Sequence, residues 1–127
     1  MSKNWKKIVL PVVILITCLG MIAVESRIKI IDRVYDNFVL DNKNHYLPCE
    51  ELPIEADVSR IVDQHQDEIR AIEQVNPGFV GIEIDTFTCP GQADLVIWYG
   101  RHQDRLAIEE IIGSDTFFGV PYRLQNR

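Results

Sequence analysis

Two cysteines outside the apolar N-terminus are the side chains best suited to form a covalent bond. Cys89 stands directly before Pro90-Gly91, at the corner between two strand-like runs, and Cys49 precedes it by 40 residues. In an exported chain such a pair forms a structural disulfide, which for a loop of this length is worth roughly 4 kcal/mol in the chain-entropy model. Two free cysteines or a redox pair are the alternatives, although no Cys-x-x-Cys motif is present. Cys18 lies in the apolar run and is interpreted as an inert small residue.

Three histidines are the candidate metal ligands and general bases. His45 stands four residues before Cys49, whereas His65 and His102 lie elsewhere in the chain. No pair among them has a recognised zinc spacing, and a cysteine in a disulfide binds no metal. We therefore predict no metal site and no cofactor. A small metal-dependent hydrolase using one of these histidines is the least favoured function.

The serines and carboxylates show no pattern typical of catalysis. No serine lies in a Gly-x-Ser-x-Gly motif, and no glycine-rich phosphate loop opens a helix. The acidic pairs Asp67-Glu68 and Glu109-Glu110 are adjacent in expected helices, so their side chains point in different directions. The sequence therefore predicts that the chain is not an enzyme.

Aromatic residues gather in the last two expected strands. The simpler interpretation is that they form the core of a sheet. In the functional interpretation, Phe117, Phe118 and Tyr122 form a surface that receives a partner, by strand addition or through aromatic anchors.

Residues 8–24 form an uncharged run of 17 residues, "IVLPVVILITCLGMIAV". As a helix this run spans roughly 25 Å, the short end of a membrane crossing. Lys3, Lys6 and Lys7 precede the run and Glu25 follows it. This asymmetry predicts a cytoplasmic N-terminus at residues 1–7, a single-pass anchor in the cell membrane, and the rest of the chain outside.

Three alternatives to an uncleaved anchor remain for this run. They are a cleaved signal peptide, a lipoprotein site at Cys18 and a buried core helix. No good small-x-small cleavage site follows the run, Thr17 fits poorly before a lipidated cysteine, and no polar face interrupts the apolar residues. The anchor is therefore the favoured interpretation.

The chain after residue 24 is strongly acidic. It carries ten Lys and Arg against nineteen Asp and Glu, a formal net charge of −9. This charge disfavours nucleic acids and anionic membrane surfaces as partners.

Residues 25–48 are predicted to be a juxtamembrane stalk and linker, and residues 49–127 an extracytoplasmic domain. The start of the linker is either a helix that continues the anchor or a short strand around residues 38–40. Its end, "DNKNHYLPCEELP", is rich in Asn, Asp and Pro and is typical of a loop.

Hydrophobic periodicity predicts the elements of the domain. Two helices are expected, at residues 57–75 and 102–112, and three strands, at residues 79–85, 94–99 and 117–124. Asn76-Pro77-Gly78 ends the first helix and Gly113 caps the second. Pro121 lacks a ladder donor, so the last strand is expected at an edge of the sheet.

This order, with a short strand added before Cys49, is β-α-β-β-α-β. It predicts an α+β domain of ferredoxin-like arrangement, with two helices on one face of an antiparallel sheet. The first two strands are then parallel, with one strand between them, and their ends lie at the same rim. This geometry brings Cys49 and Cys89 within reach of a disulfide.

The sequence favours a membrane-anchored extracytoplasmic binding or accessory domain without catalytic residues. Such a domain serves as a subunit of an envelope complex or as a regulatory ectodomain. The alternative is a domain like a protease propeptide or inhibitor, which presents residues 118–127 to an enzyme. The identity of the partner does not follow from the sequence.

Overall fold

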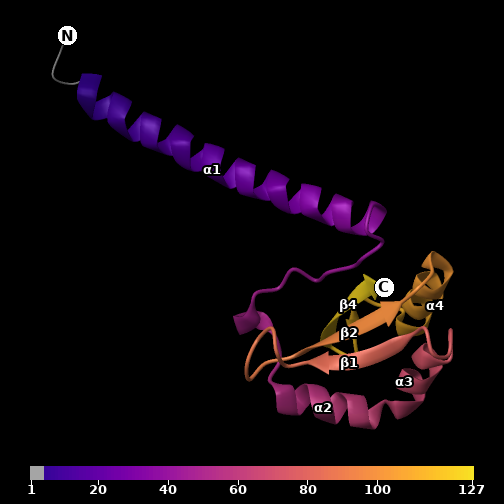
Figure 1. Ribbon diagram of the computed structural model, residues 1–127. Helices are drawn as coiled ribbons and strands as arrows, with labels where there is room; N and C mark the ends of the chain where they lie inside the picture. The colour runs from indigo at the N-terminus through magenta and orange to yellow at the C-terminus, as the bar shows by residue number, and fades with distance from the viewer. Residues whose placement is uncertain (1–4) are drawn as a thin grey trace. The chain divides into compact units, whose positions relative to one another are not determined.

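The computed structural model describes residues 5–127 of the chain. It divides into two compact units, Met1–Tyr35 and Asp36–Arg127, with the helices and strands labelled in Figure 1. The second unit begins thirteen residues before Cys49, where the sequence placed the domain boundary. Residues 36–48 therefore belong to the compact domain.

One long helix, α1, runs from Trp5 to Phe38, so it forms the described part of the first unit and its last turn belongs to the second. It contains the apolar run and continues into the predicted stalk as far as Phe38, so the alternative of a strand at residues 38–40 is wrong. Among the residues that the structure describes, no helix is long and apolar enough to cross a membrane. The predicted anchor at residues 8–24 thus has no support from the structure, and part of the predicted basic N-terminus, residues 1–4, lies outside the described residues.

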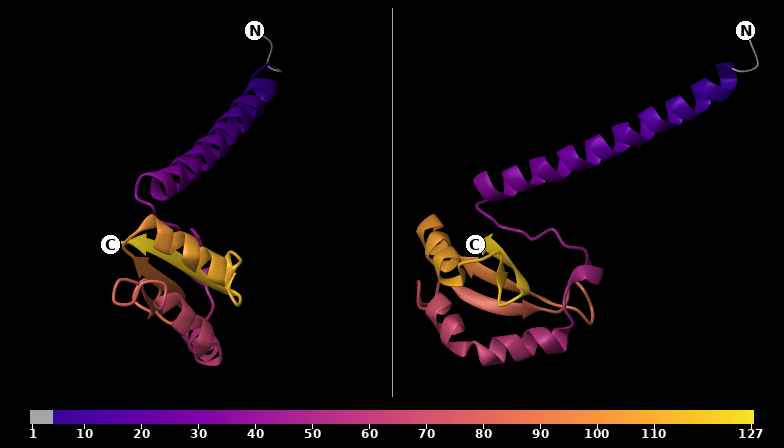
Figure 2. Two further views of the ribbon diagram at one scale, coloured as in Figure 1. Left: turned by 90° about the vertical axis from the view of Figure 1, so that its right-hand side faces the viewer. Right: turned by 180° about the vertical axis from the view of Figure 1, so that it is seen from behind.

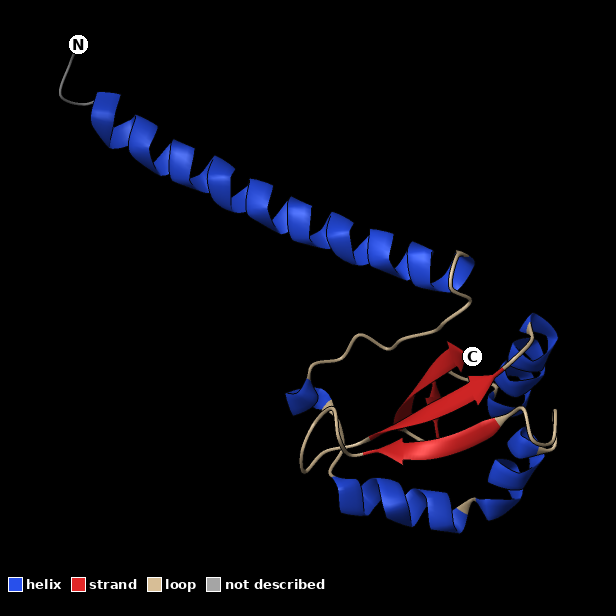
Figure 3. Cartoon of the chain, in the orientation of Figure 1, coloured by secondary structure: helices blue, strands red, loops and turns tan. Residues whose placement is uncertain are grey.

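Four strands form one mixed sheet in the second unit (Figure 3). They are β1 (Gly81–Asp85), β2 (Asp94–Tyr99), β3 (Thr116–Phe117) and β4 (Val120–Asn126), in the spatial order β1-β2-β4-β3. β2 pairs antiparallel with β1 and parallel with β4, and β3 pairs antiparallel with β4. The helix α4 (His102–Ile112) connects the two parallel strands.

The predicted helix at residues 57–75 is broken into two. After the short 3-10 helix η1 (Cys49–Glu51), α2 runs over Glu55–Gln64 and α3 over Gln66–Glu73. His65 separates them because its backbone, at φ −119° and ψ 39°, is not helical. Apolar periodicity continues across the break, so the sequence shows no sign of it.

One face of the sheet packs against α2, α3 and α4 to form the core. The register places Ile82 beside Ile97, and Ile97 beside Leu124, on this face. Helical side chains such as Val58, Ile72 and Ile108 complete the same buried cluster. Figure 2 shows α3 next to α4, where the two helices are in contact.

The ferredoxin-like arrangement is wrong in two respects, although the α+β class holds. The described residues contain no strand before Cys49, where Lys43 makes only an isolated antiparallel bridge to Leu124. Because no first strand separates them, β2 and β4 pair directly and in parallel. The polar Asn- and Pro-containing segment cannot supply the apolar alternation that a central strand needs.

The end of the chain is a hairpin, not a single edge strand. Phe118 and Gly119 form its two-residue turn, with φ of 49° and 89°, the left-handed pair that fits tight hairpins. β4 is therefore an interior strand. Pro121 fits there because the ladder with β2 begins one residue later, at Tyr122.

The predicted pairing of Cys49 and Cys89 is confirmed. Their Cα atoms lie 5.4 Å apart and their sulfurs 1.96 Å apart. The segment at Lys43 runs antiparallel to β4, and β1 runs antiparallel to β2. Because β2 and β4 are parallel, the segment that leads to Cys49 and the strand that leads to Cys89 run in the same direction and end at the same rim of the sheet. The rim was predicted correctly, but two strands lie between the segments, not one.

Backbone hydrogen bonds reinforce this junction. Ala93 donates to the carbonyl of Pro53 at 3.0 Å, and Glu55 donates to the carbonyl of Gly91 at 3.3 Å. In Figure 1, η1 accordingly lies beside the loop between β1 and β2.

Replacing Gly81 by alanine should destabilise the domain. A Cβ atom there would lie 2.0 Å from Cζ2 of Trp98, far inside van der Waals contact. We expect a loss of roughly 1–3 kcal/mol in the free energy of unfolding, as for other overpacked sites. Urea unfolding measures it, with Gly100→Ala as the control because its nearest atom would be 3.9 Å away. Equal stability of the two variants would contradict the packing described here.

Candidate functional site

The face of the sheet opposite the helices carries a buried ion cluster. Arg123, on β4, donates from Nε and Nη2 to the two carboxylate oxygens of Asp94, at 2.6 and 3.0 Å. Its Nη2 also donates to the carboxylate of Asp85. The side chain of Asp94 is only 4 % exposed, so the guanidinium compensates a charge that water hardly reaches.

His45 joins this cluster from the segment after α1. Its Nε2 lies 2.7 Å from Oδ2 of Asp94, and the backbone N–H of Leu47 donates to its Nδ1 at 3.0 Å. Because Nδ1 accepts a hydrogen bond, the ring is the neutral tautomer with its proton on Nε2. Both nitrogens are thus used within the domain.

The two aspartates of the cluster stay ionised at neutral pH. Burial by itself raises the pKa of Asp94, but hydrogen bonds from His45 and Arg123 outweigh it and hold the pKa below its usual range. At Asp85 burial is likewise outweighed, by hydrogen bonds from Thr88 and Arg123, and the pKa falls further. Neither carboxylate therefore carries a proton that it could donate near pH 7.

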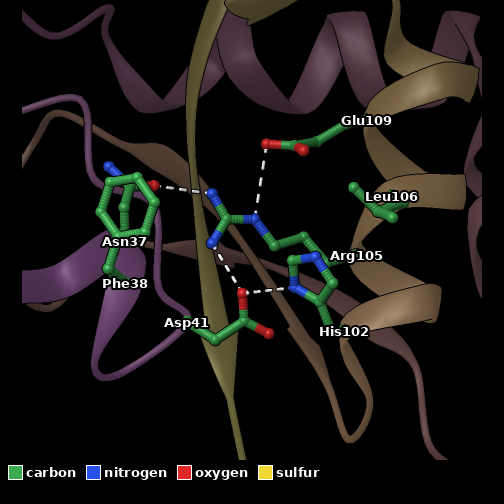
Figure 4. A pocket seen from close by; sticks show the side chains of 7 residues that line it. All are labelled: Asn37, Phe38, Asp41, His102, Arg105, Leu106 and Glu109. Carbon is green, nitrogen blue, oxygen red and sulfur yellow. Dashed lines mark hydrogen bonds and ion pairs between the residues drawn. The ribbon is translucent and has the colours of Figure 1, made fainter. Parts of the chain in front are cut away.

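A pocket of about 650 Å³ lies between the start of the second unit and α4 (Figure 4). Residues at helical spacing on α4 form one wall: His102, Arg105, Leu106 and Glu109. The other wall comes from the end of α1 and the turn after it: Asn37, Phe38 and Asp41.

The guanidinium of Arg105 holds the two walls together. It donates to Oδ1 of Asp41 at 2.9 Å and to Oδ1 of Asn37 at 2.7 Å, and its Nε lies 3.6 Å from Glu109. The side chain is 9 % exposed. Each of its three nitrogens thus faces a partner within the domain, two of them a carboxylate.

His102 and Asp41 form a carboxylate–imidazole pair at the mouth of this pocket. Nδ1 of His102 lies 2.9 Å from Oδ1 of Asp41. Burial raises the pKa of Asp41, but hydrogen bonds from His102 and Arg105 outweigh it and lower the pKa. Such a pair orients a general base in hydrolases, yet that chemistry needs a nucleophile. The side chains that line the pocket include no hydroxyl and no thiol.

The hydroxyl of Tyr99 is also occupied by a contact within the domain, next to Asp41. Its hydroxyl donates to the backbone carbonyl of Asp41. Burial and the neighbouring Asp41 raise the pKa of Tyr99 to about 12, so it keeps its proton at neutral pH.

Phe117 and Tyr122 do not form the predicted partner surface. Each is only 1 % exposed, because both side chains pack into the core on the helical side of the sheet. Phe118 is 52 % exposed and stacks on His65, with 3.4 Å between the ring centroids. The core interpretation is the right one for two of the three aromatic residues.

The three histidines are used in three separate places. His45 contacts Asp94 on β2. His65, between α2 and α3, stacks on Phe118 of the hairpin, and His102 begins α4 and contacts Asp41. Within residues 5–127 as far as they are described, no group of three His, Cys, Asp or Glu side chains is placed to hold a metal ion.

Sequence reasoning missed the partners of these residues. Asp41 lies 64 residues from Arg105, so no local pattern could connect the two. Arg123 had a usable signal, since it is the one charged residue of β4 and interrupts the buried positions on either side of it. Its partners Asp85 and Asp94 both stand at strand ends.

Searches against protein-family models, curated proteins and solved structures find no match for this chain. The function has to be inferred from the geometry of the domain itself. That geometry shows ionisable side chains paired with one another and a pocket whose lining side chains carry no hydroxyl and no thiol.

Replacing Arg123 by glutamine removes the cation shared by Asp85 and Asp94. We expect the free energy of unfolding at pH 7 to fall by roughly 3–5 kcal/mol, because the two carboxylates lose the cation that they share. Urea unfolding measures the loss. In the control Arg70→Gln, an exposed guanidinium paired with the exposed Asp67, the change should stay below about 1 kcal/mol.

The pH dependence of stability provides a second readout for the same variant. The pKa of both aspartates is lower in the folded chain than in the unfolded one. Their contribution is therefore present above the usual aspartate pKa of about 4 and is lost as the pH falls below it. We expect a steep fall in wild-type stability below about pH 4 and a shallower one in Arg123→Gln; equal slopes would contradict the role of the cluster.

Proposed function

We propose that residues 36–127 form a non-catalytic binding domain for a partner protein, acting as an envelope-complex subunit or regulatory ectodomain. The observation that carries this proposal is a contrast within the domain. Its buried ionisable side chains are paired internally, whereas several of its large apolar side chains face solvent. The latter are Phe38, Phe79, Phe87, Leu106 and Phe118.

The exposed apolar residues support contact with another protein. Phe87 is 94 % exposed and Phe79 is 68 % exposed, high values for side chains of this size. Aromatic residues in such positions are frequent anchors of interfaces, since burying one removes a large apolar area from water. Single exposed apolar residues are common on any protein, so the proposal depends on the number of these side chains in one small domain.

The location outside the cytoplasm rests on the cysteines and on the N-terminal sequence. A structural disulfide persists in oxidising compartments, and Cys49 and Cys89 are placed to form one. Residues 8–24 are uncharged and follow three lysines, which is the pattern of a single-pass anchor with the domain outside. Attachment to the cell membrane is part of this proposal.

The net charge of the domain favours some classes of partner molecule over others. Residues 36–127 carry seven Lys and Arg against seventeen Asp and Glu, a formal net charge of −10. Nucleic acid is disfavoured, and a protein with a basic or neutral surface is favoured.

A propeptide- or inhibitor-like role remains the second candidate, with a different contact surface. The segment first considered, residues 118–127, consists largely of β4, which lies between β2 and β3. Presenting it to a protease would remove an interior strand from the sheet. The exposed side chains named above serve an inhibitor or an accessory subunit equally well.

Counting thiols tests the compartment and the anchor together. In protein purified from membranes, alkylation should modify one cysteine, Cys18, without reductant and three with it. The intact mass should include residues 1–24. Three thiols that react without reductant, or recovery of the chain from the soluble fraction, would contradict the proposed location.

Site-specific photo-crosslinking in cells tests the binding function. A photoreactive phenylalanine analogue is placed in turn at residues 38, 79, 87, 106 and 118 of the full chain. We expect at least one position to give a discrete adduct heavier than the 14.6 kDa chain, while the exposed control position Glu110 gives none. If all five positions behave like the control, the domain is not a protein-binding module.

A further inference from the structure

The outer edge of β1 is unpaired among the described residues. β1 is the first strand in the spatial order of the sheet and pairs only with β2. Figures 1 and 3 show it at the margin of the sheet. An edge of five residues presents backbone donors and acceptors that a further strand can use.

An ordered turn displays Phe79 just before this strand. Pro77 and Gly78 occupy its central positions, Gly78 has φ of 84°, and the N–H of Phe79 donates to the carbonyl of Asn76 at 3.0 Å. The side chain of Asn76 donates in turn to the buried Asp104 of α4 at 2.9 Å. The turn is thus tied to the core, and its phenyl ring still faces solvent.

A second ordered turn displays Phe87 just after the strand. Oδ1 of Asp85 accepts the backbone N–H groups of Phe87 and Thr88, at 2.9 and 3.1 Å. The same carboxylate is held by Arg123. The most exposed of the domain's large apolar side chains therefore stands on a turn fixed by the buried ion cluster.

The negative charge at the edge of β1 favours some kinds of added strand over others. Ile82 and Ile84 face the core, so Glu83 between them projects from the opposite face and is exposed. If two copies of the chain paired antiparallel about the centre of β1, Glu83 would stand opposite Glu83. Like charges directly opposite each other destabilise a strand pair, whereas Lys or Arg opposite Glu83 stabilises it.

We propose that the edge of β1 binds an extended segment of a partner protein by strand addition. The segment places a Lys or Arg opposite Glu83, and apolar side chains at its two ends contact Phe79 and Phe87. Main-chain hydrogen bonds give such complexes their affinity, and the side chains give specificity. This inference rests on the proposed binding function and names the surface and the chemistry of the partner.

Crosslinking at the edge, combined with charge reversal, tests the proposal in cells that make the full chain. The photoreactive analogue at residues 79 and 87 should give the same adduct. Glu83→Lys should lower the yield of both adducts at least fivefold, whereas the matched reversal Glu110→Lys on α4 should leave it unchanged. Both reversals are at exposed positions, and urea unfolding should show changes within about 0.5 kcal/mol.

Three results would overturn the edge while leaving the binding function intact. They are adducts only at residues 38, 106 or 118, adducts that Glu83→Lys does not weaken, and an adduct with twice the mass of the chain, which identifies a second copy. Hydrogen exchange of the isolated adduct gives an independent readout. Slower exchange of backbone amides within Gly81–Asp85 supports strand addition, and unchanged exchange there overturns it.

Discussion

The guanidinium of Arg123 is the contact on which the arrangement of the sheet depends. It lies on β4, is hydrogen-bonded to Asp94 at the start of β2, and reaches Asp85 at the end of β1. One cation thus connects three strands on the face opposite α2, α3 and α4. Asp94 is buried, so a strand order that separated it from Arg123 would leave its carboxylate buried without the guanidinium. This cost favours the observed strand order over others.

The same cluster connects the segment after α1 to the sheet. His45 reaches Asp94, and the backbone of Lys43 exchanges two hydrogen bonds with Leu124, at 2.9 and 2.8 Å. Residues 36–48 have no regular secondary structure beyond the end of α1. They are nevertheless part of the domain, because their polar groups find partners 49 or more residues further along the chain.

How well a feature could be predicted from the sequence depends on how far apart in the chain its interacting residues lie. Local periodicity was sufficient to predict β1, β2 and α4, since each depends on apolar residues a few positions apart. The break at His65 escaped it because the ring stacks on Phe118, more than fifty residues away in sequence. The parallel pairing of β2 with β4 also escaped it, because charged residues at non-core positions decide this pairing as much as apolar ones do. The cysteine pair was found because both segments end at one rim, a result that survives the wrong strand count.

The rigidity of the two turns that flank β1 makes an unpaired edge usable for binding. Ordering flexible side chains and loops at an interface subtracts free energy from association. Asn76 and Asp85 already fix the backbone that carries Phe79 and Phe87, so less ordering remains when a partner arrives. The exposed carboxylate of Glu83 disfavours self-association of the same edge in the meantime, as charges on natural edge strands do. Asp85 connects the two arrangements, since the same carboxylate is held by Arg123 within the sheet and fixes the turn that carries Phe87.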